Sequence, residues 1–345
     1  MPGNNFPSSL SSEEQNCGFA KVKYSSFNLL GTDFVNEHEQ EAYEKSLALL
    51  QSLRIINTAK QLEAVKKSQF ERITARTFPF ANMERLTVAN DMMILTFLID
   101  DHWDSVDAED KKAMDRVNMV SSQLVNILQG HEPQPNDDPV IFGMKSILDR
   151  TISMNSNWIR LMREDYIRGL EVCHLERVSR MDADTLTLPM YESNRYYSAI
   201  ALPFIDLSAA MVCSGDPNDV LSSPYIQMMT RLAVYHISYS NDIIGFHKER
   251  KETSLNNLIK VMAKNNQQSF EDALEGALKS TNQLVDAFLN LEKMVHIHGL
   301  SLHVGRDRLN GDILKYIEVL KYWMRGSLDW HFESARYKDY TPISS

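Results

Sequence analysis

The stretch FLIDDHWDSVD (residues 97–107) ends a longer segment, MERLTVANDMMILT (residues 83–96), in which apolar residues recur every three or four positions. That apolar series is Leu86, Ala89, Met93 and Phe97. The spacing places these side chains on one face of an α-helix. We therefore expect a long helix that packs its apolar face against the core and ends near residue 104.

Three carboxylates, Asp100, Asp101 and Asp104, continue this face at its C-terminal end. Carboxylates there oppose the helix macrodipole, at about 0.3–1 kcal/mol each, and a bound cation would offset that cost. Magnesium is a natural candidate, because it takes oxygen ligands and often binds through one or two carboxylates together with substrate phosphates. The alternative is an ordinary solvated helix end, with Ser105 or Asp107 capping the following helix.

Composition favours long helices and excludes some partners. Only 13 Gly and 11 Pro occur among 345 residues, and 43% of the residues are hydrophobic, enough for a large core. The net charge of −10 argues against non-specific binding to nucleic acid or to anionic membranes. Any phosphorylated ligand would therefore need metal ions and a few well-placed cationic side chains.

Cellular location follows from three further observations. Cys17, Cys173 and Cys213 show no CxxC spacing, which argues against a disulfide framework or a structural zinc site. No apolar run approaches the roughly 18 residues of a membrane span, and the first residues lack the pattern of a signal peptide. We expect a cytoplasmic protein without a membrane span, in which residues 1–30 form a flexible arm.

Helical periodicity extends over most of the remaining chain. Breaks are predicted at residues 78–82, 130–139 and 214–224, where Pro, Gly, Asn and Asp cluster. Pro203 should kink or split the helical run around it, because proline lacks an N–H and clashes with the preceding turn. With no alternating strands, internal repeat or long linker, the predicted fold class is all-α, with residues 31–345 as a single helical domain.

A second polar cluster, NDIIGFHKE (residues 241–249), ends another long helical segment. Asn241, Gly245 and Glu249 stand four residues apart on nearly one face, with their ends about 12 Å apart along the axis. A glutamate can reach back along its helix, so Asn241 and Glu249 can bind one ion, with water at Gly245. Taken alone, such a segment is more often an ordinary solvated helix end, and the metal interpretation depends on its pairing with the first motif.

Cationic side chains accompany both clusters. Lys248 precedes Glu249, Arg195 lies in the run that Pro203 interrupts, and Arg336 with Tyr337 follows the last predicted helix. Arginine binds phosphate through a planar fork and lysine as a point charge. Any one of these residues alone is more often an ordinary surface charge.

Together these motifs resemble the class I terpene synthases, in particular the microbial single-domain type found in social amoebae. FLIDDHWD resembles their aspartate-rich DDxxD motif, NDIIGFHKE their Asn-Ser-Glu motif, and WMRGSLDWHFESARY (residues 323–337) their C-terminal Arg-Tyr stretch. Arg195, 46 residues before Asn241, matches their diphosphate-sensing arginine. Four motifs in order span most of residues 80–340, which makes the resemblance specific.

The resemblance implies a helical bundle around an apolar cavity, in which three Mg²⁺ ions hold an isoprenyl diphosphate. It implies metal ligands at Asp100, Asp101, Asp104, Asn241, Gly245 and Glu249. It implies diphosphate contacts from Arg195, Lys248, Arg336 and Tyr337, with Arg195 and the backbone carbonyl of Ala199 triggering ionisation. Gly245 departs from the usual Ser or Thr, and Ala199 from the frequent glycine.

The cavity should exclude water and present aromatic faces to a carbocation. The candidates are Phe78, Phe80, Phe97, Tyr196 and Trp323, although tryptophans at heptad spacing, such as Trp323 and Trp330, are more often core than cavity lining. The favoured substrate is the C15 farnesyl diphosphate, giving a sesquiterpene, with the C20 geranylgeranyl diphosphate as the alternative. Remaining alternatives are a trans-prenyltransferase, which usually has a second aspartate-rich motif, and a non-catalytic helical binding protein. The oligomeric state is expected to be monomer or homodimer.

Overall fold

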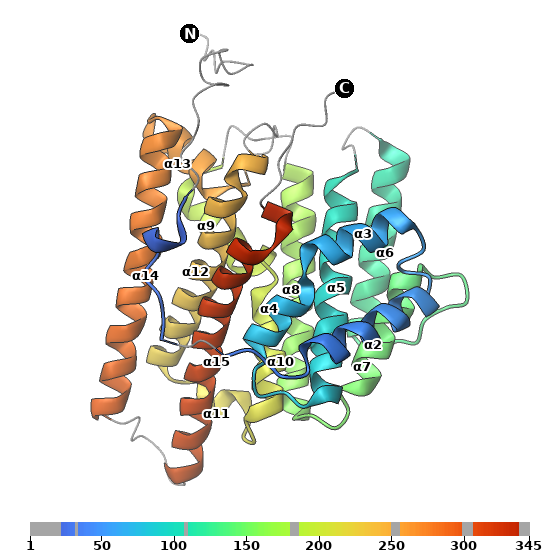
Figure 1. The fold of residues 1–345 in the computed structure, drawn as a ribbon, viewed down its shortest axis with the longest axis horizontal. Helices are drawn as coiled ribbons and strands as arrows, with labels where there is room; N and C mark the ends of the chain where they lie inside the picture. Colours follow the sequence, from blue (N-terminus) through green and yellow to red (C-terminus); the bar gives the residue numbers. More distant parts are fainter. Residues whose placement is uncertain are drawn as a thin grey trace.

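The structure, a computed structural model, describes residues 22–31, 34–106, 110–179, 186–249, 256–298 and 306–337. Within these ranges every regular element is a helix, and the helices form one bundle (Figure 1). The predicted all-α fold is therefore confirmed. None of the described helices is both long enough and apolar enough to cross a membrane.

The elements are, in chain order, η1 (Tyr24–Ser26), α2 (Glu39–Ser52), α3 (Ala59–Ser68), α4 (Phe70–Thr77), α5 (Met83–Asp104), α6 (Lys111–Leu128), α7 (Pro139–Arg150), α8 (Ser156–Ser179), α9 (Leu188–Ser198), α10 (Ala201–Val212), α11 (Pro217–Leu221), α12 (Pro224–Glu249), α13 (Leu258–Asn266), α14 (Phe270–His298), α15 (Arg306–Glu333) and η3 (Ala335–Tyr337).

Local sequence explains where these helices begin. The side chain of Asn82 accepts a hydrogen bond from the Arg85 N–H and caps α5, and Asp110 caps α6 in the same way through the Ala113 N–H. Pro203 splits its helical run as expected. α9 ends and α10 begins just before it, so Pro203 lies in a first turn, where its missing N–H has no intrahelical partner.

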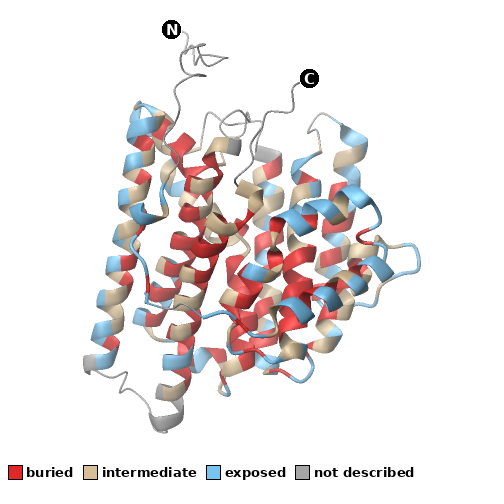
Figure 2. Ribbon diagram, viewed as in Figure 1, coloured by how far each residue is buried: buried red, intermediate tan, exposed pale blue. Residues whose placement is uncertain are grey.

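The arrangement of the long helices creates one functional end of the bundle. α5, α8, α12, α14 and α15 run along a common direction, and the shorter α2, α3 and α4 cross in front of the side that holds α5 and α8 (Figure 1). α12 packs against α14 and α15, and α10 packs against α8. The buried faces of these helices point inward (Figure 2). α5, α8, α12 and α15 all end at the upper end in Figure 1, so both acidic motifs are brought to that end.

Part of the expected N-terminal arm lies within the described residues. Residues 22–30 pack against the bundle, because the apolar side chains of Phe27 and Leu30 are 5% and 3% exposed. The Tyr24 hydroxyl also donates to Asp329, and the Asn28 N–H donates to Asn282 at 2.7 Å. Residues 1–21, the rest of the expected arm, lie outside the described residues.

Candidate active site

A pocket opens at the end of the bundle where the two acidic motifs lie, between α5, α8, α10, α12 and α15. Asp100, Arg195 and Asn241 all line it. Met93 precedes Asp100 by two turns on α5, and Ile237 precedes Asn241 by one turn on α12, so apolar side chains line the deeper part. The pocket is therefore polar at its mouth and apolar below.

The carboxylates of the first motif lie at the C-terminal end of α5, and one of them, Asp100, lines the pocket. Asp100 faces the pocket and stays accessible to solvent, whereas Asp101 forms a two-pronged ion pair with Arg336, at 2.7 and 2.5 Å. Partial dehydration of its carboxylate and the nearby charges of Asp104 and Asp101 raise the pKa of Asp100 to about 6. The crowded negative charge is what a bound cation would relieve.

The second motif lies on α12, as predicted. Asn241 accepts a hydrogen bond from Arg195 at 2.9 Å through its Oδ1, while its Nδ2 lies 3.2 Å from the Tyr337 hydroxyl, to which it donates. Glu249 bends back along the helix. Its Oε1 lies 2.8 Å from the position that a Cβ on Gly245 would occupy, so the missing side chain of Gly245 leaves room for the carboxylate.

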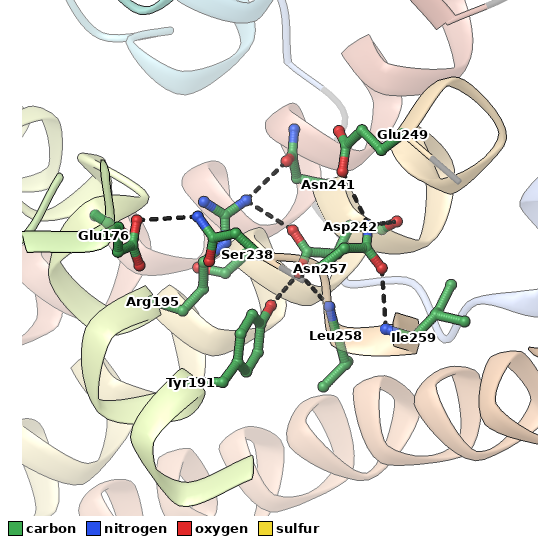
Figure 3. A network of polar contacts seen from close by, with 12 residues as sticks. Glu176, Tyr191, Arg195, Ser238, Asn241, Asp242, Glu249, Asn257, Leu258 and Ile259 are labelled. Atoms are coloured by element: carbon green, nitrogen blue, oxygen red, sulfur yellow. Dashed lines mark hydrogen bonds and ion pairs between the residues drawn. The ribbon is translucent and has the colours of Figure 1, made fainter. Parts of the chain in front are cut away.

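Arg195 is held by a carboxylate that the sequence analysis did not identify. Its guanidinium forms an ion pair with Asp242 at 2.7 Å, and Asp242 is only 1% exposed. The Tyr191 hydroxyl and the Leu258 N–H also donate to Asp242, so three groups converge on this carboxylate (Figure 3). Although burial opposes the positive charge, Asp242 raises the pKa of Arg195 well above its ordinary value. The sequence signal that could have identified Asp242 is an acidic residue inside an otherwise apolar helical run.

The backbone between α9 and α10 is strained where it borders the pocket. Ile200 has φ 51°, a left-handed conformation that β-branched residues rarely adopt. Ala199, the expected backbone contact, lies beside it and lines the pocket. Gly169 allows the backbone between α9 and α10 to pack closely against α8. A Cβ at Gly169 would lie 2.4 Å from Ile200 Cδ1 and 3.1 Å from the Tyr197 carbonyl oxygen.

Substitution Gly169→Ala is expected to move this break and lower stability by about 1–3 kcal/mol, because the added methyl group overpacks the contact. Thermal unfolding measures the effect. Gly311→Ala serves as the matched control, because a Cβ at Gly311 meets nothing within 4 Å. Equal melting temperatures for the two variants would contradict the role assigned to Gly169.

The expected wall residues divide between the pocket and other parts of the fold. Phe97 and Trp323 line the pocket, whereas Phe78 lies behind Trp323, with ring centroids 5.7 Å apart. The expectation for Phe78 is thus corrected, and so are two others. Phe80 is 37% exposed on the outer surface, and Tyr196 packs against Tyr197, Tyr235 and the Arg231 guanidinium outside the lining. The side chain of Lys248 lies outside the described residues.

Two further residues that line the pocket, His331 and Trp103, were not predicted. His331 lines the pocket, and burial lowers its pKa to about 4, which keeps it neutral. Its Nδ1 donates to the Ser327 carbonyl at 2.5 Å, so its Nε2 accepts from Asn241 Nδ2 at 3.0 Å and orients that amide. Trp103, a variable position of the first motif, lines the pocket, and the Arg177 guanidinium lies 4.4 Å from its ring centroid. Neither role has a local signature in sequence.

The donor set fits magnesium. Within the described parts of the chain, no three acidic, cysteine or histidine side chains lie close enough to form a ready-made metal cage. Magnesium seldom needs such a cage, because substrate phosphates and water complete its coordination. Carboxylates from α5 and an amide and a carboxylate from α12 supply the hard oxygen atoms. Desolvation first, and then the charges of Asp104 and Asp101, raise the pKa of Asp100, and a bound cation would offset both effects.

Comparison with known proteins identifies the family. Residues 91–287, more than half of the chain and including both acidic motifs, match the family model described as terpene synthase family 2, C-terminal metal binding. The chain belongs to terpene synthase family 2. The resemblance noted in the motifs is thereby confirmed, and metal binding is a property of the matched family domain.

Two named relatives of this terpene synthase match it over most of their length. It is 25% identical over 311 residues to germacrene A synthase of Nostoc punctiforme. The matched region covers 88% of this chain and 91% of that protein. It is 24% identical over 309 residues to 7-epi-alpha-eudesmol synthase of Streptomyces viridochromogenes, which covers 88% and 89% of the two chains.

The fold of this terpene synthase is also shared with solved structures. The crystal structure of α-eudesmol synthase superposes with a TM-score of 0.79 at 22% identity, covering 91% of this chain and 99% of that chain. Hedycaryol synthase, solved in complex with HEPES, gives a TM-score of 0.73 at 18% identity, covering 89% and 99%. At these identities the likeness shows the fold.

Proposed function

We propose that this protein catalyses the Mg²⁺-dependent ionisation and cyclisation of farnesyl diphosphate to a sesquiterpene, releasing diphosphate. One observation carries the proposal: Asp100, Arg195 and Asn241 line a pocket whose deeper wall is apolar, and Arg336 lies 5.2 Å from the ring centroid of the lining residue Phe97. This arrangement suits a substrate with a charged diphosphate head and a hydrocarbon tail. The matched family and its two named relatives support the same reaction class.

In this proposal the two motifs share the binding of three Mg²⁺ ions. Asp100, Asp101 and Asp104 would hold two of them, and Asn241 with Glu249 the third, with water in place of a side chain at Gly245. Bound Mg²⁺ supplies Lewis-acid stabilisation of the departing diphosphate.

The protein's own cations would complete the diphosphate site. Arg195, Lys248, Arg336 and Tyr337 are the proposed contacts. Asp101 holds Arg336, and Asp242 holds Arg195, so these two guanidinium groups are already positioned before diphosphate binds. Such preorganised groups stabilise the charge that develops as the C–O bond breaks. The carbonyl of Ala199, beside the strained Ile200, faces the same region in this proposal.

The apolar part of the pocket would control the carbocation. Phe97 and Trp330 have ring centroids 5.4 Å apart, and Trp323 lies one heptad below Trp330 on α15; all three line the pocket. Their π faces favour a nearby cation by about 2 kcal/mol or more where water is excluded. Exclusion of water also prevents premature quenching to an alcohol.

The relatives support the C15 substrate. The printed name of the Streptomyces viridochromogenes enzyme describes it as cyclising (2E,6E)-farnesyl diphosphate. Geranylgeranyl diphosphate, giving a diterpene, is the second candidate. We further propose a single domain over residues 31–345, present as monomer or homodimer in the cytoplasm.

The test is incubation of the purified protein with Mg²⁺ and, separately, the C10, C15 and C20 diphosphates, followed by gas chromatography–mass spectrometry. We expect a cyclic hydrocarbon or alcohol from the C15 substrate. Product from the C20 substrate alone would replace the sesquiterpene assignment with the diterpene one. Longer diphosphates formed with isopentenyl diphosphate would indicate a prenyltransferase. Absence of turnover and of Mg²⁺-diphosphate binding would indicate a non-catalytic binding protein.

A further inference from the structure

Asn257, which caps α13, is bonded to the proposed metal ligand Glu249. Asn257 is 1% exposed, and its Oδ1 accepts a hydrogen bond from the Ile259 N–H at 2.9 Å. Its Nδ2 donates both to the backbone carbonyl of Asp242 at 2.9 Å and to Glu249 Oε2 at 3.0 Å. One amide therefore begins α13 and contacts the end of α12 (Figure 3).

The cap determines which way this amide faces. Only the amide oxygen can accept from the Ile259 N–H, so the nitrogen must lie on the side of Asp242 and Glu249. The Leu258 N–H donates to the Asp242 carboxylate at 2.8 Å, which ties the same turn of α13 to α12 by a second route. The direction of the Asn257 Nδ2 donor is thus fixed by groups that do not belong to the metal site.

This donor constrains the carboxylate of Glu249. With Oε2 held by Asn257, Oε1 lies over Gly245, 2.8 Å from the position of a Cβ there, on the path back toward Asn241. A glutamate otherwise loses considerable rotamer freedom when it binds an ion. A neutral amide restricts that freedom without cancelling the negative charge that attracts the cation.

We propose that Asn257 is a positioning residue for the reaction: it holds Glu249 in the orientation that binds the metal–diphosphate complex, and it couples that orientation to the cap of α13. The inference rests on the proposed function, because it takes Glu249 as a metal ligand. Hydrogen-bond partners of metal ligands typically change metal affinity by about 10–100-fold when removed.

The test uses Asn257→Ser, because serine caps a helix about as well as asparagine but has no amide nitrogen to reach Glu249. Asn82→Ser is the matched control, the same exchange at the cap of α5. The readouts are the melting temperature, the affinity for inorganic diphosphate with Mg²⁺ by calorimetry, and the number of Mn²⁺ ions bound with diphosphate by electron paramagnetic resonance. We expect affinity to fall about 10–100-fold in Asn257→Ser only.

A double variant separates positioning from a general structural effect. If Asn257 acts through Glu249, Glu249→Gln/Asn257→Ser should bind diphosphate no more weakly than Glu249→Gln alone. Additive losses would overturn the inference, as would wild-type affinity in Asn257→Ser. Asn257→Thr, which also retains a capping oxygen, is measured in parallel in case the serine variant folds poorly. The same loss of affinity in Asn257→Thr supports the inference. Wild-type affinity in Asn257→Thr overturns it.

Failure of the proposed function gives a different result. If Glu249 is not a metal ligand, Glu249→Gln itself retains the wild-type affinity for Mg²⁺ and diphosphate. If Glu249→Gln weakens binding while Asn257→Ser does not, only the positioning role is overturned.

Discussion

Asp100→Asn is expected to lower turnover by about 10³-fold, because a loss of several kcal/mol of metal-ion stabilisation in the transition state corresponds to that factor. Asparagine keeps the size of the side chain but loses the charge at the position facing the pocket. The measurement is steady-state product formation from the accepted diphosphate with saturating Mg²⁺.

Stability should not fall with activity in this variant. Dehydration and the neighbouring carboxylates of Asp104 and Asp101 disfavour the charged form of Asp100, so a neutral side chain should leave the melting temperature of the metal-free protein at neutral pH unchanged or higher. Glu84→Gln, at the opposite end of the same helix and exposed, is the control and should keep full activity. Wild-type turnover in Asp100→Asn would remove the metal assignment.

Arg195→Gln should damage both activity and stability, for separate reasons. The guanidinium is a proposed diphosphate contact, and loss of one preorganised donor to a developing charge typically lowers kcat by about 10²–10³-fold. The substitution also leaves Asp242, 1% exposed, without its ion-pair partner. Breaking a buried pair in this way costs about 3–5 kcal/mol. Kinetics and thermal unfolding measure the two effects independently.

A second substitution should separate the loss of turnover from the loss of stability. Arg195→Gln/Asp242→Asn removes the uncompensated charge, so the melting temperature should recover toward that of the wild type while turnover stays low. Arg231→Gln, an exposed arginine stacked on Tyr196, is the control. Recovery of turnover together with stability would assign Arg195 a structural role in place of a diphosphate contact.

The helices, and the placement of each motif on its helix, could be predicted from sequence because both depend on neighbours along the chain. The apolar spacing before Asp100 predicted α5, and Pro203 predicted the break between α9 and α10. Asn241, Gly245 and Glu249 share one face of α12 because helix geometry fixes residues four apart, whatever surrounds them. The sequence by itself thus determined the fold class and the two acidic motifs.

Which surfaces meet was decided only by the tertiary structure. Phe80 and Tyr196 have the chemistry of wall residues, yet they lie outside the pocket because the packing of neighbouring helices sets which way each side chain faces. The pairing of Arg195 with Asp242 joins residues on different helices, and the pairing of Asn257 with Glu249 joins the N-cap of α13 to the end of α12. No local periodicity encodes such a pair, since it depends on the crossing and register of packed helices, which the whole core sets together.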